Sequence, residues 1–199
     1  MNGKFNTYLR ESFESLLRTK NFILISAALF IFGAALGFFV YQLSPDNEFF
    51  SLILNELEKI GGGLGEKSAV ENIVFLFIHN LEAILFSMAS GVFLFFPVLF
   101  ILINGATIGF FFGAANNPAL FIAIIPHGIF EIPSFLIGTG VGIRLGFVII
   151  MPKKGKTRIE CLREVSSDAV KILILIIPML LIAAAVEITI SAELAKMLV

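Results

Sequence analysis

The feature that most constrains this chain is a series of apolar runs, each close to the length of a membrane-spanning helix. A helix needs roughly 20 apolar residues to cross the hydrocarbon core, because its backbone hydrogen bonds must be satisfied internally. The runs lie at about residues 22–43, 73–88, 92–115, 119–150 and 172–194. With 58% hydrophobic and 15% charged residues, the chain has too little polar surface to cover a soluble globule. The sequence predicts an all-α, polytopic membrane bundle of about five transmembrane helices.

The fourth run is too long for one simple crossing, and it contains Pro126. Proline interrupts the helical hydrogen-bond ladder. We therefore predict a fourth helix broken at Pro126, with a half-helix over 119–125 and the true span over 127–150. One long, kinked and tilted helix is the alternative.

Basic residues indicate how a single membrane domain, residues 1–199, is oriented. They gather in an amino-terminal segment (1–21) and in the loop after the fourth span (151–171), whereas acidic residues dominate residues 44–72. Cytoplasmic segments near a membrane are enriched in Lys and Arg. We expect a multi-pass protein of the cell membrane with a cytoplasmic amino terminus and an extracytoplasmic carboxyl terminus.

Two segments outside the spans have the spacing of amphipathic helices. One lies in the cytoplasmic segment 1–21 and the other in the extracytoplasmic loop 44–72. Each is expected to lie along a membrane surface or to pack against the bundle or a partner subunit.

Several spans keep polar side chains at a depth where an ionised group costs roughly 2.5–3.5 kcal/mol. The candidate polar cluster consists of His79, Asn80, Glu82, Asn104, His127, Glu131 and Glu187. His127 and Glu131 are four residues apart, so they share a helical face, and the spacing of His79 and Glu82 has the same effect. Arg144 is expected to snorkel to the cytoplasmic interface and not to be a buried charge.

Three interpretations of this cluster remain open. It fixes helix register through interhelical hydrogen bonds and charge pairs, it relays protons or ions, or it holds a metal. Any metal site would use His79, Glu82, His127 and Glu131, which are imidazole and carboxylate ligands. We expect no cofactor, and the sequence singles out no catalytic residue.

Small residues recur at a spacing of four in two spans. They are Gly105, Gly109 and Gly113 in the third span, and Ser134, Gly138, Gly142 and Gly146 in the fourth. This small-xxx-small pattern lets helix backbones approach closely. It predicts helix-packing faces.

Two ordered motifs resemble the stage II sporulation protein M (SpoIIM) family. The first is Asn104-Gly105 followed by Gly109, and the second is Pro126-His127-Gly128 followed by Glu131. The resemblance covers the second span onward. It implies a protein of about five helices that, in spore-forming bacteria, assembles with peptidoglycan-remodelling partners and has no established chemistry of its own.

The sequence therefore favours a non-enzymatic membrane protein that acts as a subunit or scaffold of a complex. Its expected partners are the lipid bilayer and either copies of itself or other membrane proteins. Nucleic acid is not expected, because the net charge is -1 and basic residues form no phosphate-binding footprint. The alternatives are a small transporter or channel that uses the broken helix, and a metal-dependent intramembrane enzyme.

Overall fold

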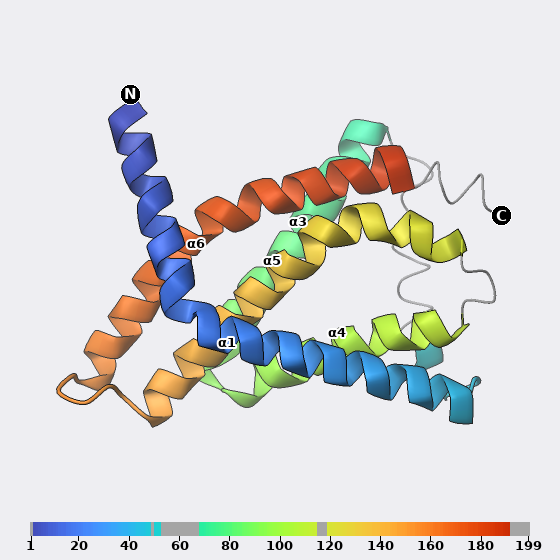
Figure 1. Ribbon diagram of the computed structural model, residues 1–199, viewed down its shortest axis with the longest axis horizontal. Coiled ribbons are helices and arrows are strands. Elements are labelled where there is room, and N and C mark those ends of the chain that lie inside the picture. Colours follow the sequence, from blue (N-terminus) through green and yellow to red (C-terminus); the bar gives the residue numbers. More distant parts are fainter. Residues whose placement is uncertain (1, 49, 53–67, 115–118, 192–199) are drawn as a thin grey trace.

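The computed structural model describes residues 2–48, 50–52, 68–114 and 119–191, without the side chains of residues 2–5, 119–127 and 191. Its helices are α1 (Asn2–Leu43), α3 (Ala69–Ala89), α4 (Phe95–Ala114), α5 (Ala119–Ile150) and α6 (Arg158–Val186) (Figure 1). A 3-10 turn, η1 (Ser90–Val92), follows α3, and a π-helical turn, η2 (Glu187–Ser191), extends α6. The described residues form no strand, so the prediction of an all-α fold is confirmed.

Five helices of the described chain are long and apolar enough to cross a membrane. Their candidate spans are Asn6–Leu43, Ala69–Val92, Phe95–Ala114, Gly128–Ile150 and Arg158–Ile190. The prediction of about five transmembrane helices is therefore confirmed. The predicted amphipathic helix of the 44–72 loop lies largely outside the described residues, as does the end of the fifth predicted span.

Helix α1 joins the predicted cytoplasmic segment to the first span without a break. Its 42 residues correspond to about 63 Å of helix, twice the roughly 30 Å of a hydrocarbon core, so one straight crossing cannot hold it. Figure 1 shows that its amino-terminal part runs across α6 before the helix changes direction. In this part Ser12, Ser15 and Thr19 each donate a hydrogen bond to the carbonyl four residues earlier, an arrangement that tends to bend helices.

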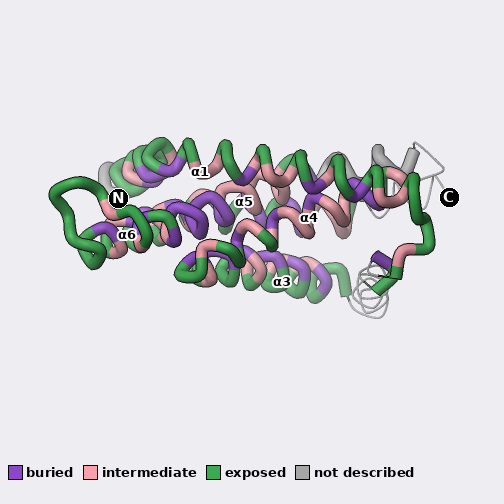
Figure 2. Tube along the Cα trace, turned by 90° about the horizontal axis from the view of Figure 1, so that it is seen from below, coloured by how far each residue is buried: buried purple, intermediate pink, exposed green. Residues whose placement is uncertain are grey.

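Helix α5 is the centre of the bundle. It contacts α1, α3, α4 and α6, and 56% of the apolar stretch in its span is buried, against 17–28% in the other spans. Figure 2 shows α1 along one edge of the molecule and α3 along the opposite edge. Any polar side chain that α5 turns inward therefore meets protein.

The predicted break at Pro126 is absent, because the backbone of α5 is helical from Ala119 to Ile150. Proline removes a single N–H donor, and packed transmembrane helices tolerate that loss when neighbouring groups adjust. Helix α6 likewise continues through Pro178. The alternative of one long helix fits the structure.

Capping boxes start two of the helices. The Ser68 hydroxyl accepts from the Glu71 N–H while the Glu71 carboxylate accepts from the Ser68 N–H, which starts α3. Thr157 and Glu160 start α6 in the same way. Each box satisfies two backbone donors that a helix start leaves without partners.

Helices α1 and α4 cross at a contact made by glycines. A Cβ on Gly37 would lie 2.6 Å from the carbonyl carbon of Ala106, and one on Gly109 would lie 2.6 Å from that of Ala34. A Cβ on Gly105 would overlap the Phe30 carbonyl oxygen. Bare glycine backbone is what allows this approach.

Four glycines of α5, between Gly138 and Gly146, face α1, α3 and η1. A Cβ on Gly142 would overlap the Ser87 carbonyl oxygen, and one on Gly146 would lie 2.5 Å from the Gly91 carbonyl oxygen. At Gly138 the nearest atom is the Ile84 side-chain methyl Cγ2, at 2.6 Å, which can move. The remaining small residues of the two rows are also placed: Gly113 lies against the Tyr41 side chain, and buried Ser134 donates to the Phe130 carbonyl at 2.7 Å.

We expect Gly37→Leu to lower the stability of the protein in detergent by about 1–3 kcal/mol, because the new side chain must push the α4 backbone away. Ala35→Leu, two residues along α1 at an exposed position, is the matched control and should leave stability unchanged. Thermal unfolding of both variants measures the difference. Equal midpoints would show that the α1–α4 contact is not close-packed.

Candidate functional site

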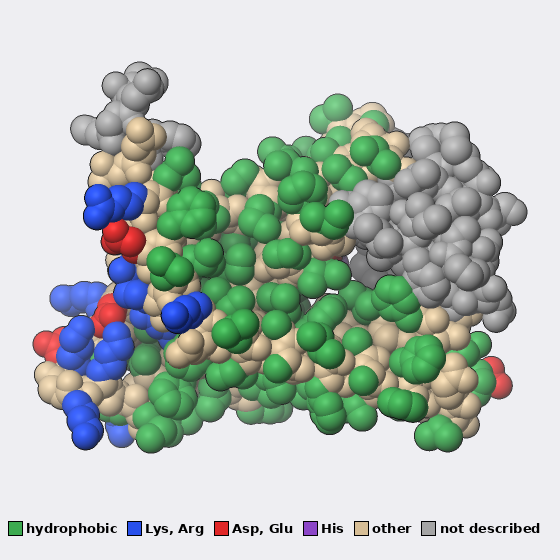
Figure 3. Space-filling view, in the orientation of Figure 1, with side chains coloured by type: hydrophobic (Ala, Val, Ile, Leu, Met, Phe, Trp, Pro, Cys, Tyr) green, Lys and Arg blue, Asp and Glu red, His purple; other side chains and the backbone are tan. Residues whose placement is uncertain are grey.

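Charged side chains gather at one end of the molecule. Figure 3 shows most of the Lys and Arg side chains of this face beside the start of α1 and the loop between α5 and α6, while hydrophobic side chains predominate over the rest of the described part of this face. This end also contains acidic side chains. It holds the densest polar network of the described chain.

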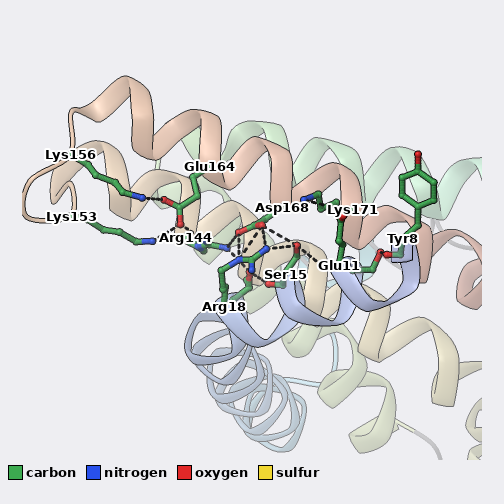
Figure 4. Close-up of polar contacts among 12 residues, drawn as sticks. Tyr8, Glu11, Ser15, Arg18, Arg144, Lys153, Lys156, Glu164, Asp168 and Lys171 are labelled. Atoms are coloured by element: carbon green, nitrogen blue, oxygen red, sulfur yellow. Dashed lines mark hydrogen bonds and ion pairs between the residues drawn. The ribbon is translucent and has the colours of Figure 1, made fainter. Parts of the chain in front are cut away.

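The centre of this network is an ion pair between α5 and α6. Arg144 donates from Nη1 to Asp168 Oδ2 at 2.8 Å and to Thr19 Oγ1 of α1 at 2.8 Å (Figure 4). The side chains of Arg144 and Asp168 are only 3% and 4% exposed. Because both charges are buried, each needs a counter-charge and hydrogen-bond partners within the protein.

Helix α1 completes the network from the opposite side of Asp168. The Ser15 hydroxyl shares its proton between Oδ1 and the Glu11 carbonyl, each 2.9 Å away, and Arg18 approaches Oδ1 through Nη2 at 2.6 Å. The Arg18 side chain is 41% exposed, so it reaches solvent while it binds the carboxylate. We call Ser15, Arg18, Thr19, Arg144 and Asp168 the Asp168 knot.

The expectation that Arg144 snorkels to the interface is wrong, since its side chain is buried and paired. The reason is the acid on α6, which lies 24 residues away in sequence and offers a partner within the protein. Sequence reasoning also missed Asp168 itself. The signal available in the sequence was the spacing of Ser12, Ser15 and Thr19, which places three small polar side chains on one helical face. In the structure these side chains are fully buried.

A second carboxylate links the knot to the loop. Glu164 accepts from Lys153 at 2.6 Å and from Lys156 at 2.8 Å, and it lies 3.9 Å from Arg144 Nη2. The hydrogen bond to Glu164 raises the pKa of the exposed Lys156 ammonium. These contacts place the loop against the start of α6.

The predicted cluster on α3 divides between two faces of the helix. His79 and Glu82 are exposed on the outer surface, whereas the neighbouring Asn80 is buried. The inward face of α3 is set by Leu76 and Ile84, each four residues from Asn80. Residues 79 and 82 therefore point away from the bundle interior and do not join Asn80 there.

The other members of the predicted cluster lie on three helices. Asn104 on α4 donates to the Phe100 carbonyl of its own helix at 2.8 Å. Glu131 on α5 and Glu187 at the start of η2 are half-buried and close enough to interact electrostatically. The His127 side chain lies outside the described residues, so its pairing with Glu131 stays a prediction.

The side chains of three of the four candidate metal ligands are described, and the structure does not bring these three together. In the described part of the chain, no three His, Cys, Asp or Glu side chains are grouped closely enough to hold a metal ion. His79 and Glu82 lie at the surface of α3, while Glu131 lies on α5.

Five apolar helices held together by glycine contacts and a buried ion pair define a polytopic helical membrane protein. The chain belongs to the stage II sporulation protein M family, whose model matches residues 26–192. This confirms the family resemblance. The motif glycines Gly105 and Gly109 are the residues that α4 packs against α1.

Two curated relatives are uncharacterized proteins of the archaeon Methanocaldococcus jannaschii. One is 27% identical over 186 residues, which is 88% of this chain and 97% of that protein. The other is 26% identical over 200 residues, with coverage of 96% and 90%. No solved structure matches the chain.

We expect Asp168→Ala to destabilise the protein by about 3–5 kcal/mol, because it removes the carboxylate that the buried Arg144 guanidinium hydrogen-bonds and leaves only the Glu164 carboxylate, 3.9 Å away. Glu11→Ala removes the more exposed pair with Lys171, whose atoms are 3.1 Å apart, and should cost less than about 1 kcal/mol. Thermal unfolding in detergent separates the two. A small, equal loss in both variants would contradict a structural role for the knot.

Proposed function

We propose that this protein is a non-enzymatic subunit or scaffold of a membrane complex, and that the outer face of α3 is its main contact with a partner. The observation that carries the proposal is the exposure of His79 and Glu82 near the middle of the span Ala69–Val92. Facing lipid there, an ionised side chain costs roughly 2.5–3.5 kcal/mol. A protein partner that supplies hydrogen bonds removes this cost.

Other polar groups of the chain are paired with each other, and their pairing supports the same function. In the Asp168 knot, the Asp168 carboxylate accepts hydrogen bonds from two guanidinium groups and a hydroxyl. Buried Ser87 and Thr139 hydrogen-bond to each other at 3.1 Å, which joins α3 to α5. These groups hold helices together, as a scaffold requires.

The orientation belongs to the proposal as well. The end that contains the Asp168 knot also contains the basic loop after α5 and Arg10, Lys20 and Arg163, which are exposed. Cytoplasmic segments close to the membrane are enriched in such residues. We therefore place this end, and with it the amino terminus, in the cytoplasm.

Native mass spectrometry of the protein, extracted from its own membrane in polymer-bounded nanodiscs, tests the proposal. We expect wild type to exceed the 21.8 kDa of a single chain. The double variant His79→Leu/Glu82→Leu should shift to the single-chain mass, because leucine satisfies a lipid-facing surface without a partner. Its thermal stability in detergent should not fall.

Gln42→Leu is the matched control, since it makes a similar polar-to-apolar change at an exposed position of α1. It should keep the larger mass. A wild-type protein that emerges as a single chain from native membranes would refute the proposed function.

A further inference from the structure

The outward face of α3 carries a row of residues that we call the α3 seam: Phe75, His79, Glu82, Phe86 and Ala89, all of them exposed. We propose that the α3 seam docks against the α3 seam of a second copy of this chain, with His79 of each copy contacting Glu82 of the other. This inference rests on the proposed function, because it names the partner that the complex requires.

The spacing of the seam suits contact between two helices along their length. Its members are separated by four, three, four and three residues. This alternation keeps a seam facing its partner when two helices cross at about 20°. The buried face of α3 follows a different row, Leu76, Asn80 and Ile84. Each seam residue stays exposed, although the Phe86 ring also contacts the Phe100 ring of α4, with centroids 6.5 Å apart.

The charges of the seam are complementary to those of a second copy. Copies of one membrane protein share an orientation, so a two-fold axis along the membrane normal places two α3 helices parallel. If position 79 of one copy contacts position 82 of the other, the symmetry creates the reverse contact as well. Positions 79 and 82 are then offset by about 4.5 Å along the axis, which both side chains can span. Two identical His79–Glu82 contacts form in one dimer.

Within one chain these two groups do not engage each other. Among the described residues, neither side chain forms an ion pair or hydrogen bond with the other, and the His79 ring stacks on Phe75 with centroids 6.2 Å apart. Both groups keep hydrogen-bonding capacity that lipid cannot satisfy. An unrelated helix would have to supply a donor and an acceptor at matching depths, which a second copy does by symmetry.

The aromatic members of the seam lie on either side of the polar pair. Phe75 and Phe86 are 37% and 58% exposed, one helical turn before His79 and one after Glu82. In a dimer they would separate the pair from lipid along the seam, while Ala89 allows the helices to approach. A low-dielectric setting strengthens a hydrogen bond between paired groups.

The test uses two complementary variants of the full chain in liposomes, with association measured by energy transfer between differently labelled copies. The Glu82→His chain carries two imidazoles on its seam, and the His79→Glu chain carries two carboxylates. Each variant alone lacks complementary partners, so its self-association should weaken by about tenfold. A mixture of the two should regain wild-type association to within about threefold, because every imidazole again meets a carboxylate.

The mixture also excludes pairing within one chain, since neither variant keeps an imidazole and a carboxylate together on its seam. Gln42→Glu adds a carboxylate outside the seam and should leave association unchanged. A mixture that associates no better than either variant alone overturns the proposal. Absence of energy transfer between wild-type copies overturns self-docking. In that case a multi-chain mass from native membranes would still support the proposed function. A single-chain mass would refute the proposed function and self-docking together.

Discussion

The rest of the structure depends on the contact between Arg144 and Asp168, because it joins the central helix to α6 and gives α1 a place to bind. Both charges are buried, and such a pair contributes little net stability compared with an apolar pair of the same shape. A shift of α5 against α6 would separate Arg144 from the carboxylate that it hydrogen-bonds, so the pair favours one register of the two helices. The Thr19 hydroxyl accepts a hydrogen bond from the Arg144 guanidinium and so links α1 to the same ion pair.

Close contact of glycines with the backbone of a neighbouring helix provides the attraction that this ion pair does not. Helices in a bilayer gain no hydrophobic energy from each other, because lipid tails are as apolar as leucine, so packing must supply the difference. The reciprocal placement of Gly37 on Ala106 and of Gly109 on Ala34 makes the α1–α4 contact the tightest apolar crossing for which both sides are described. The knot fixes one end of α1, and this crossing fixes the rest of its span.

The sequence was sufficient for the number and approximate positions of the spans and for the family, because both depend on local runs and motifs. It did not settle whether α5 continues through Pro126. The length of an apolar run predicts a span whatever packs beside it. Which face of a helix turns inward depends on partners elsewhere in the chain. On α3 both faces carry polar groups, so Asn80 and His79 were equally good candidates for the interior, and the structure selects Asn80. The contact between Arg18 and Asp168 joins positions 150 residues apart, and no local pattern specifies it.

Two sets of polar groups in the described chain have different surroundings. The Asp168 knot is complete within one molecule and involves α1, α5 and α6, while the α3 seam lies on a helix that contributes no residue to the knot. In a medium without water, a polar group near mid-membrane must be satisfied by protein, so under the proposed self-docking the knot serves folding and the α3 seam serves assembly. This division explains how α3 can keep an imidazole and a carboxylate on its outer face without weakening the bundle, since the helix is already anchored through Ser87, Ile84 and the Gly91–Gly142 backbone contact.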